Sequence, residues 1–127
     1  KAMAYESGAA FISTVGSDFM KVGGIEKVEE IFKTARRKKP CIIFIDEFDA
    51  FYHHELSYKI SKRLFKSDSQ LFVTTHDTFL LSNDLLRPDC FFILNDNQIR
   101  AICDLTDKEL RFGHNLEKLY RGGTFNL

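Results

Sequence analysis

The stretch Cys41-Ile42-Ile43-Phe44-Ile45-Asp46-Glu47-Phe48-Asp49-Ala50 decides how the rest of this sequence is interpreted. Five apolar residues in a row are typical of a strand that is buried on both faces, as the central strands of parallel sheets are. The run then ends abruptly in carboxylates, and the tip of a strand is where such charges reach solvent while the strand stays buried. The segment therefore predicts a buried parallel strand with acidic residues at its carboxyl end.

On either side of this segment, short apolar runs alternate with amphipathic stretches. Apolar spacings of three and four residues predict helices over residues 25–39 and 54–66. Further strands are predicted at 9–15, 71–75, 90–94 and 99–103, and shorter helical segments at 78–86, 106–112 and 115–120. We expect one α/β domain over residues 1–127, a three-layer α/β/α sandwich with a mostly parallel sheet of four to five strands. Ligand chemistry then belongs at the carboxyl ends of the strands.

The composition excludes several classes of protein. The 127 residues suit one domain, and the 18 basic and 18 acidic residues cancel, so nucleic-acid binding is not indicated. The longest apolar run is too short to span a bilayer. Three cysteines without CxxC spacing argue against a disulfide framework and a zinc site, and they suit a reducing, cytoplasmic setting. Cys41 and Cys90 lie in apolar runs, where we expect buried thiols.

The acidic strand end has two interpretations. Apolar residues followed by Asp46-Glu47 form the Walker B pattern of P-loop ATPases, in which the Asp holds Mg²⁺ through water and the Glu polarises the attacking water. The alternative is a strand followed by the acidic first turn of a helix. The complete string favours Walker B, because it joins a buried strand to both carboxylates.

Residues 1–50 resemble an AAA+ ATPase of the FtsH-type protease group. Lys1-Ala2-Met3-Ala4-Tyr5-Glu6-Ser7-Gly8 looks like the end of the helix that follows the phosphate-binding loop. Residues 11–13 and 16–19 are similar to the next strand and the entry to the pore loop, and residues 28–47 complete the match. The segment at residues 20–24 is shorter than the family's aromatic pore loop. The resemblance implies ATP and Mg²⁺ as cofactors.

Residues 42–127 also resemble the C-terminal part of an ABC-type ATPase of the RecF/SMC-like group. Residues 46–56 look like that group's Walker B and D-loop, and Leu71-Phe72-Val73-Thr74-Thr75-His76-Asp77 looks like its strand and switch histidine. The two resemblances share residues 42–50, which suggests a hybrid joined at Walker B, an AAA+-like segment at 1–50 and an ABC-like segment at 51–127.

Together the resemblances imply a set of site residues. The implied catalytic residues are Glu47 as general base and His76 as phosphate sensor. The implied cofactor-binding residues are Asp46, Asp49 and Asp77, with Asp46 on Mg²⁺ through water. For His76, a polar residue at a strand end is an equal alternative. His53-His54-Glu55 is interpreted as a solvated helix start rather than a metal site, because adjacent histidines on a helix point apart.

No GxxxxGK[ST] motif occurs in the 127 residues, so no loop of this sequence is predicted to cradle phosphates. The first hypothesis is a partial ATPase core that is weak or inactive alone, with nucleotide and further copies of the chain (a homo-oligomer) as candidate partners. A related possibility is a subunit completed by a P-loop-bearing partner chain. The second is a folded scaffold, recombined or engineered, without catalytic function. Glu47→Gln separates them, because only an ATPase would keep nucleotide binding and lose turnover.

Overall fold

The computed structural model describes residues 1–19, 24–49, 53–111 and 113–127. Most of the segment expected at the pore loop (residues 20–23) and Ala50 lie outside the described residues. The chain divides into two compact units, Lys1–Asp77 and Thr78–Leu127, and each is described by itself. The expectation of a single domain stays a prediction.

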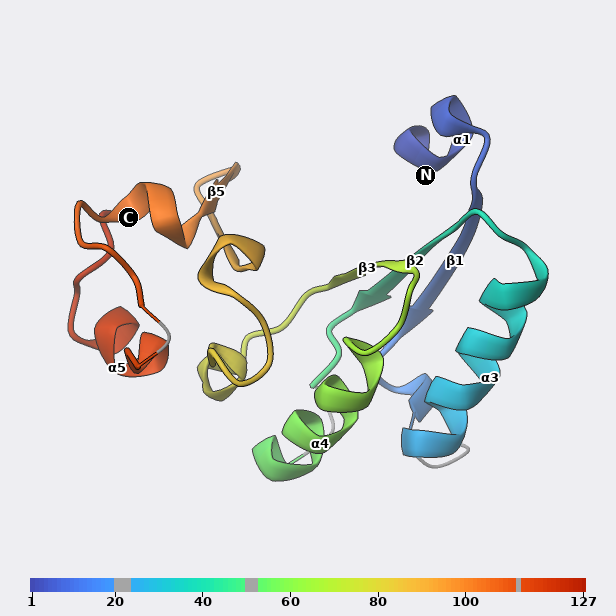
Figure 1. Ribbon diagram of the computed structural model, residues 1–127, viewed down its shortest axis with the longest axis horizontal. Coiled ribbons are helices and arrows are strands. Elements are labelled where there is room, and N and C mark those ends of the chain that lie inside the picture. Colours follow the sequence, from blue (N-terminus) through green and yellow to red (C-terminus); the bar gives the residue numbers. More distant parts are fainter. Residues whose placement is uncertain (20–23, 50–52, 112) are drawn as a thin grey trace. The chain divides into compact units, whose positions relative to one another are not determined.

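The first unit is built on three parallel strands in the order β1–β2–β3 (Figure 1). They are β1 (Ala10–Val15), β2 (Cys41–Asp46) and β3 (Gln70–Val73), connected by the helices α3 (Gly24–Arg37) and α4 (His54–Leu64). Ile42 pairs with Phe11 on one side, and Ile45 pairs with Val73 on the other. The predicted central strand, its two neighbours and both long helices are confirmed, and the carboxyl ends of the strands meet at one edge.

One side of this sheet carries the main core. Ile43 and Ile45 of β2 are completely buried, as are Val28 of α3 and Ile60 and Leu64 of α4. The apolar spacing of α3 and α4 places these side chains on the inward stripes of the helices. This packing fixes the middle strand, and with it the position of the residues that follow β2.

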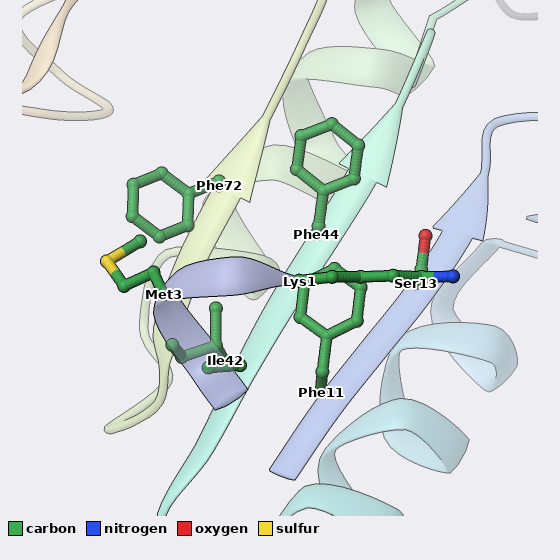
Figure 2. A pocket seen from close by; sticks show the side chains of 8 residues that line it. Lys1, Met3, Phe11, Ser13, Ile42, Phe44 and Phe72 are labelled. Atoms are coloured by element: carbon green, nitrogen blue, oxygen red, sulfur yellow. The ribbon is translucent and has the colours of Figure 1, made fainter. Parts of the chain in front are cut away.

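The other side of the sheet is covered by the short helix α1 (Ala2–Ser7), which ends at Gly8 in the left-handed conformation (φ 72°). Between α1 and the sheet lies a pocket of about 410 Å³ (Figure 2). Its lining is mostly apolar: Lys1, Met3, Ala4, Phe11, Ser13, Ile42, Phe44 and Phe72. The unit therefore has helices on both sides of the sheet, with the larger layer formed by α3 and α4.

The second unit contains a hairpin and short helical turns. Strands β4 (Phe92–Asn95) and β5 (Gln98–Ala101) pair antiparallel through Asp96 and Asn97, whose φ angles are 47° and 61°. Positive φ at both turn residues is the geometry of a tight type I′ hairpin. Around it lie the 3₁₀ helices η1 (Thr78–Leu80), η2 (Pro88–Cys90) and η3 (Ile102–Leu105), and the helix α5 (Leu116–Arg121). Its buried cluster is Ile102, Leu105, Leu116 and Phe125.

This hairpin corrects the predicted sheet. In the described residues the parallel sheet has three strands, not four to five, because β4 and β5 form a separate two-stranded sheet. A two-residue turn permits only antiparallel pairing, since parallel strands need a long crossover connection. Cys90, expected to be buried, is exposed because it precedes β4 in η2.

Two predicted helices are also wrong. Within residues 78–86 the 3₁₀ turn η1 covers only Thr78–Leu80, and the Ser82 hydroxyl then accepts the Asp84 N–H. A local side-chain bond of this kind offers the backbone an alternative to a helix. The side chain of Asn83 donates to the carbonyls of Arg111 and His114. Residues 106–111 are likewise irregular, with the Thr106 hydroxyl accepting the Lys108 N–H. The helix predicted at 115–120 is confirmed as α5.

Within the described part of the chain, no helix is long and apolar enough to cross a membrane.

Candidate functional site

The acidic turn, defined as residues 46–49, begins with the last residue of β2 at the carboxyl edge of the parallel sheet. Asp46 and Asp49 are half-buried, and Glu47 is exposed with a left-handed backbone (φ 47°). Phe48 is completely buried and meets Phe19 edge to face, with ring centroids 5.5 Å apart. An aromatic pair of this kind stabilises by about 0.5–1.5 kcal/mol beyond its burial. Phe48 therefore anchors the turn while the carboxylates on both sides of it reach the sheet edge.

Thr74 connects the acidic turn to the end of β3. Its hydroxyl donates to Oδ1 of Asp46 and accepts the N–H of Glu47 at 2.9 Å. The Thr74 N–H donates to the carbonyl of Ile45, and the Phe48 N–H donates to the carbonyl of Thr74, both at 3.0 Å. The pairing of β2 with β3 thus continues past the strands and includes the turn.

Thr75 makes a second connection, one residue further on. Its hydroxyl donates to Oδ1 of Asp49 and accepts the N–H of Asp77 at 2.9 Å. His76 lies between Thr75 and Asp77 and is exposed. The ends of β2 and β3 therefore bring Asp46, Glu47 and Asp49 beside the segment that carries His76 and Asp77, as the sequence predicted for the carboxyl edge.

Gly16, directly after β1, packs against the backbone of the acidic turn. Its N–H donates to the carbonyl of Asp46 at 3.0 Å. A Cβ at this position would overlap the carbonyl oxygen of Glu47 and lie 2.6 Å from that of Phe48. Only glycine lets the end of β1 approach the turn this closely.

The donors at this edge suit one kind of metal site. Among the residues that the structure describes, no group of three or more His, Cys, Asp or Glu side chains could hold a metal ion. Mg²⁺ beside phosphates needs fewer protein ligands, because it keeps several waters and uses one or two carboxylates. Asp46, oriented through Oδ1 by Thr74, has a second oxygen for a metal-bound water. The acidic turn therefore fits Mg²⁺ bound with a nucleotide, and does not fit a metal bound by protein groups alone.

Two other features lie apart from this chemistry. The pocket under α1 is lined by residues at the start of the chain and in the strands, and no residue of the acidic turn is among them. His53 caps α4, with Nδ1 accepting the Glu55 N–H at 3.5 Å, and the rings of His53 and His54 lie 4.1 Å apart. The cap agrees with the interpretation of His53-His54-Glu55 as a helix start. The expectation that the two rings point apart is wrong, because His53 is extended (φ −65°, ψ 140°) and lies outside the helix.

The sequence interpretation missed Thr74, Thr75 and Gly16 as residues of this edge. The signal for the threonines was their position, directly after an apolar strand that neighbours the acidic strand. Since the carboxyl ends of parallel strands share an edge, hydroxyls at that position have carboxylates within reach. The close approach of Gly16 had no signal beyond a glycine at the end of a strand.

Comparison with known proteins places this architecture in a family. The model of the ATPase family associated with various cellular activities (AAA) matches residues 1–99. The chain belongs to the AAA family. The match includes residues 42–50, the expected hybrid junction, and the comparisons show neither an ABC-type segment nor a hybrid origin. The three-stranded parallel sheet agrees with a P-loop NTPase-like fold.

Individual relatives match a shorter part of the AAA domain. The chain is 53% identical over 53 residues to a proteasome-activating nucleotidase of Methanococcus maripaludis, covering 39% of this chain and 13% of that protein. It is 53% identical over 53 residues to the ATP-dependent zinc metalloprotease FtsH of Acidimicrobium ferrooxidans, covering 39% of this chain and 8% of that protein. To the FtsH of Ralstonia pickettii it is 55% identical over 53 residues, covering 39% of this chain and 7% of that protein. The chain thus spans about an eighth or less of these relatives.

Proposed function

We propose that this chain forms the Mg²⁺- and water-handling half of an AAA ATP-hydrolysing site. The observation that carries the proposal is the acidic turn, fixed between the ends of β1 and β3 by Gly16, Thr74 and the buried Phe48. Rigid placement of carboxylates at one edge is what phosphoryl transfer needs, because its catalysis is mostly positioning and charge stabilisation.

Each carboxylate has a separate role in this proposal. Asp46, half-buried and held by Thr74, holds the metal through water, and Glu47, exposed beside it, accepts the proton of the attacking water. The Thr75 hydroxyl donates to Oδ1 of Asp49 and accepts the backbone N–H of Asp77, and we assign both carboxylates to the metal's water shell. Mg²⁺, when bound, would neutralise charge on the phosphate oxygens.

His76 has the least support. It follows Thr75 at the same edge and is exposed, so its imidazole is available to a phosphate oxygen. The sensor role rests on the ABC-type resemblance, and a solvated strand-end histidine remains the alternative. His76→Ala separates the two in a complex that supplies the P-loop, because only a sensor lowers turnover there when it is removed.

The phosphate-cradling half of the site must come from elsewhere, since no GxxxxGK[ST] motif occurs in these 127 residues. We propose that a P-loop-bearing segment or partner supplies it, because copies of these 127 residues add no such motif. Without that half, ATP binding should be weak and turnover negligible.

The topology supports a place for that partner. Among the described strands, β3 pairs only with β2, so its other edge has no partner. Helices α3 and α4 connect β1 to β2 to β3, whereas α1 lies on the opposite face (Figure 2). Because crossover connections are right-handed, the connecting helices move to the other face of the sheet where the strand order reverses. Ligands bind at that switch point. The free edge of β3, beside Thr74 and the acidic turn, is therefore where a strand ending in a P-loop would fit.

Titration with a fluorescent ATP analogue, with and without Mg²⁺, tests the proposal. We expect Mg²⁺-dependent binding near the millimolar range, about −4 kcal/mol, which Asp46→Ala abolishes and Glu47→Gln retains. Asp68→Ala is the matched control, because Asp68 is exposed and precedes β3 at the opposite edge of the sheet. If the folded chain shows no Mg²⁺-dependent binding at millimolar nucleotide, the proposal fails and the scaffold hypothesis takes its place.

A further inference from the structure

We infer that Thr74 is a positioning residue of this site, which aims the carboxylate of Asp46 and holds the backbone of Glu47 through a single hydroxyl. The inference rests on the proposed function, since it assigns Thr74 a task in binding the metal–nucleotide complex. Four bonds carry it, two from the backbone and two from the side chain of Thr74.

The backbone bonds bring Thr74 to the turn. Val73 pairs with Ile45, so Thr74 lies opposite Asp46 by continuation of the parallel register. The bonds from the Thr74 N–H to Ile45 and from the Phe48 N–H to Thr74, both 3.0 Å, close this pairing around the turn. Thr74 therefore faces Asp46 and Glu47 whatever its side chain is, which leaves the hydroxyl as the part that can be tested.

The Thr74 hydroxyl donates one hydrogen bond to the acidic turn and accepts another from it. It donates its one hydrogen to Oδ1 of Asp46, and one of its lone pairs accepts the Glu47 N–H at 2.9 Å. The first bond orients the carboxylate. The second stabilises a non-glycine residue at φ 47°, a conformation that is uncommon without such support.

A shape-only role for Thr74 makes different predictions from a positioning role. Valine keeps the β-branched shape that suits the end of a strand and removes the hydroxyl, whereas serine keeps the hydroxyl and removes the methyl group. If Thr74 serves only packing, valine is tolerated and serine is harmful. If it serves positioning, the order is reversed.

Two measurements on the whole chain decide between these roles. The first is hydrogen exchange of the Glu47 amide by nuclear magnetic resonance. The second is a titration with Mn²⁺–ATP, in which the paramagnetic metal broadens the amide signals of residues 46–49. The variants are Thr74→Val and Thr74→Ser, and the matched control is Thr14→Val, because Thr14 also donates its hydroxyl to a carboxylate (Asp18, 2.6 Å) near the same edge.

For Thr74→Val we expect exchange of the Glu47 amide to be at least about tenfold faster. Its affinity for Mn²⁺–ATP should be about 10- to 100-fold lower, the usual cost of losing a residue that orients a metal ligand. In Thr74→Ser the exchange rate and the affinity should remain close to those of the unaltered chain, and Thr14→Val should change neither quantity by more than about threefold. A Glu47 amide that stays protected in Thr74→Val overturns the inference, as does unchanged metal–nucleotide affinity.

The two readouts separate this inference from the proposed function. If the unaltered chain shows no broadening at residues 46–49 with Mn²⁺–ATP, the proposed function fails and the assigned task of Thr74 fails with it, whatever the amide does. If the unaltered chain binds and Thr74→Val binds equally well, only the inference about Thr74 fails.

Discussion

The hydrophobic cores of the two units are built from different secondary-structure elements. In residues 1–77, helices α3 and α4 bury one face of a parallel sheet, and Phe19, Ile43, Ile45 and Phe48 are completely buried. In residues 78–127 the core is a cluster of four buried side chains, and the hairpin exposes Phe92, Leu94 and Ile99 by 61%, 72% and 70%. The first unit therefore rests on packing between distant elements, and the second on local turns, caps and a short hairpin. Their responses to mutation should differ accordingly.

Two phenylalanines test this difference most strongly. Phe48→Ala should lower the free energy of unfolding of the first unit by about 3–5 kcal/mol, because it opens a cavity under the acidic turn. Phe92 lies on the exposed face of β4, so Phe92→Ala should change the free energy of unfolding of the second unit by no more than about 0.5 kcal/mol. Urea denaturation followed through resolved amide signals of each unit measures both. Equal losses would contradict the comparison, since they would mean that the Phe92 ring is not exposed in solution.

A pair of glycines gives the next largest effect. Gly16→Ala should destabilise the first unit by about 1–3 kcal/mol, because its Cβ would push into the backbone of the acidic turn. Gly113→Ala is the matched control in the second unit, where a Cβ meets nothing within 4 Å. The same denaturation series measures the difference. A harmless Gly16→Ala would show that β1 and the turn can separate without cost.

The cap of α5 tests how far the second unit relies on local bonds. Oδ1 of Asn115 accepts the Lys118 N–H at 2.9 Å at the start of this six-residue helix. Asn115→Ala should cost about 1 kcal/mol in the second unit alone, and Asn115→Asp, which keeps the acceptor, should cost less. Amide exchange of Leu119 and Tyr120 reports the change. A loss that also appears in the first unit would break the distinction between the two.

The same difference explains what the sequence could predict. The strand at residues 41–46 and the helices around it were predictable, because burial on two faces and a helical stripe both leave a hydrophobic pattern. The acidic edge followed from the end of that strand, and its Walker B interpretation agrees with the AAA family match. The roles of Thr74 and Thr75 were not predicted, because two threonines after an apolar run look like ordinary strand residues until the neighbouring strand is known.

In the second unit, patterns of apolar residues misled the prediction. Residues 78–86 have helical spacing, but the turn ends at Leu80 and the Ser82 hydroxyl bonds to the local backbone instead. The apolar runs at residues 90–94 and 99–103 predicted a fourth and a fifth strand of the main sheet. Their two-residue connection at Asp96 and Asn97 instead makes them a hairpin with an exposed apolar face. Turn geometry, rather than hydrophobicity, decided this unit.

The smallest expected effect concerns the thiol of Cys41, at the start of β2. Burial raises the pKa of this thiol above its ordinary value of 9.0, and the charge of Lys38 opposes the shift in part. The unfolded chain therefore loses the Cys41 proton first as the pH rises, so the free energy of unfolding of the first unit should begin to fall near pH 9 and stop falling above the raised pKa. The slope contributed by one proton is at most about 1.4 kcal/mol per pH unit. The variant Cys41→Ala removes this contribution. Below pH 8 the difference in free energy of unfolding between the two chains should be constant. Above pH 9 it should shrink if the unaltered chain starts as the more stable one.

Parallel stability curves from pH 7 to 10.5 would contradict this prediction. They would show that the Cys41 thiol ionises as readily in the folded sheet as in the unfolded chain, and that this end of β2 is open to water.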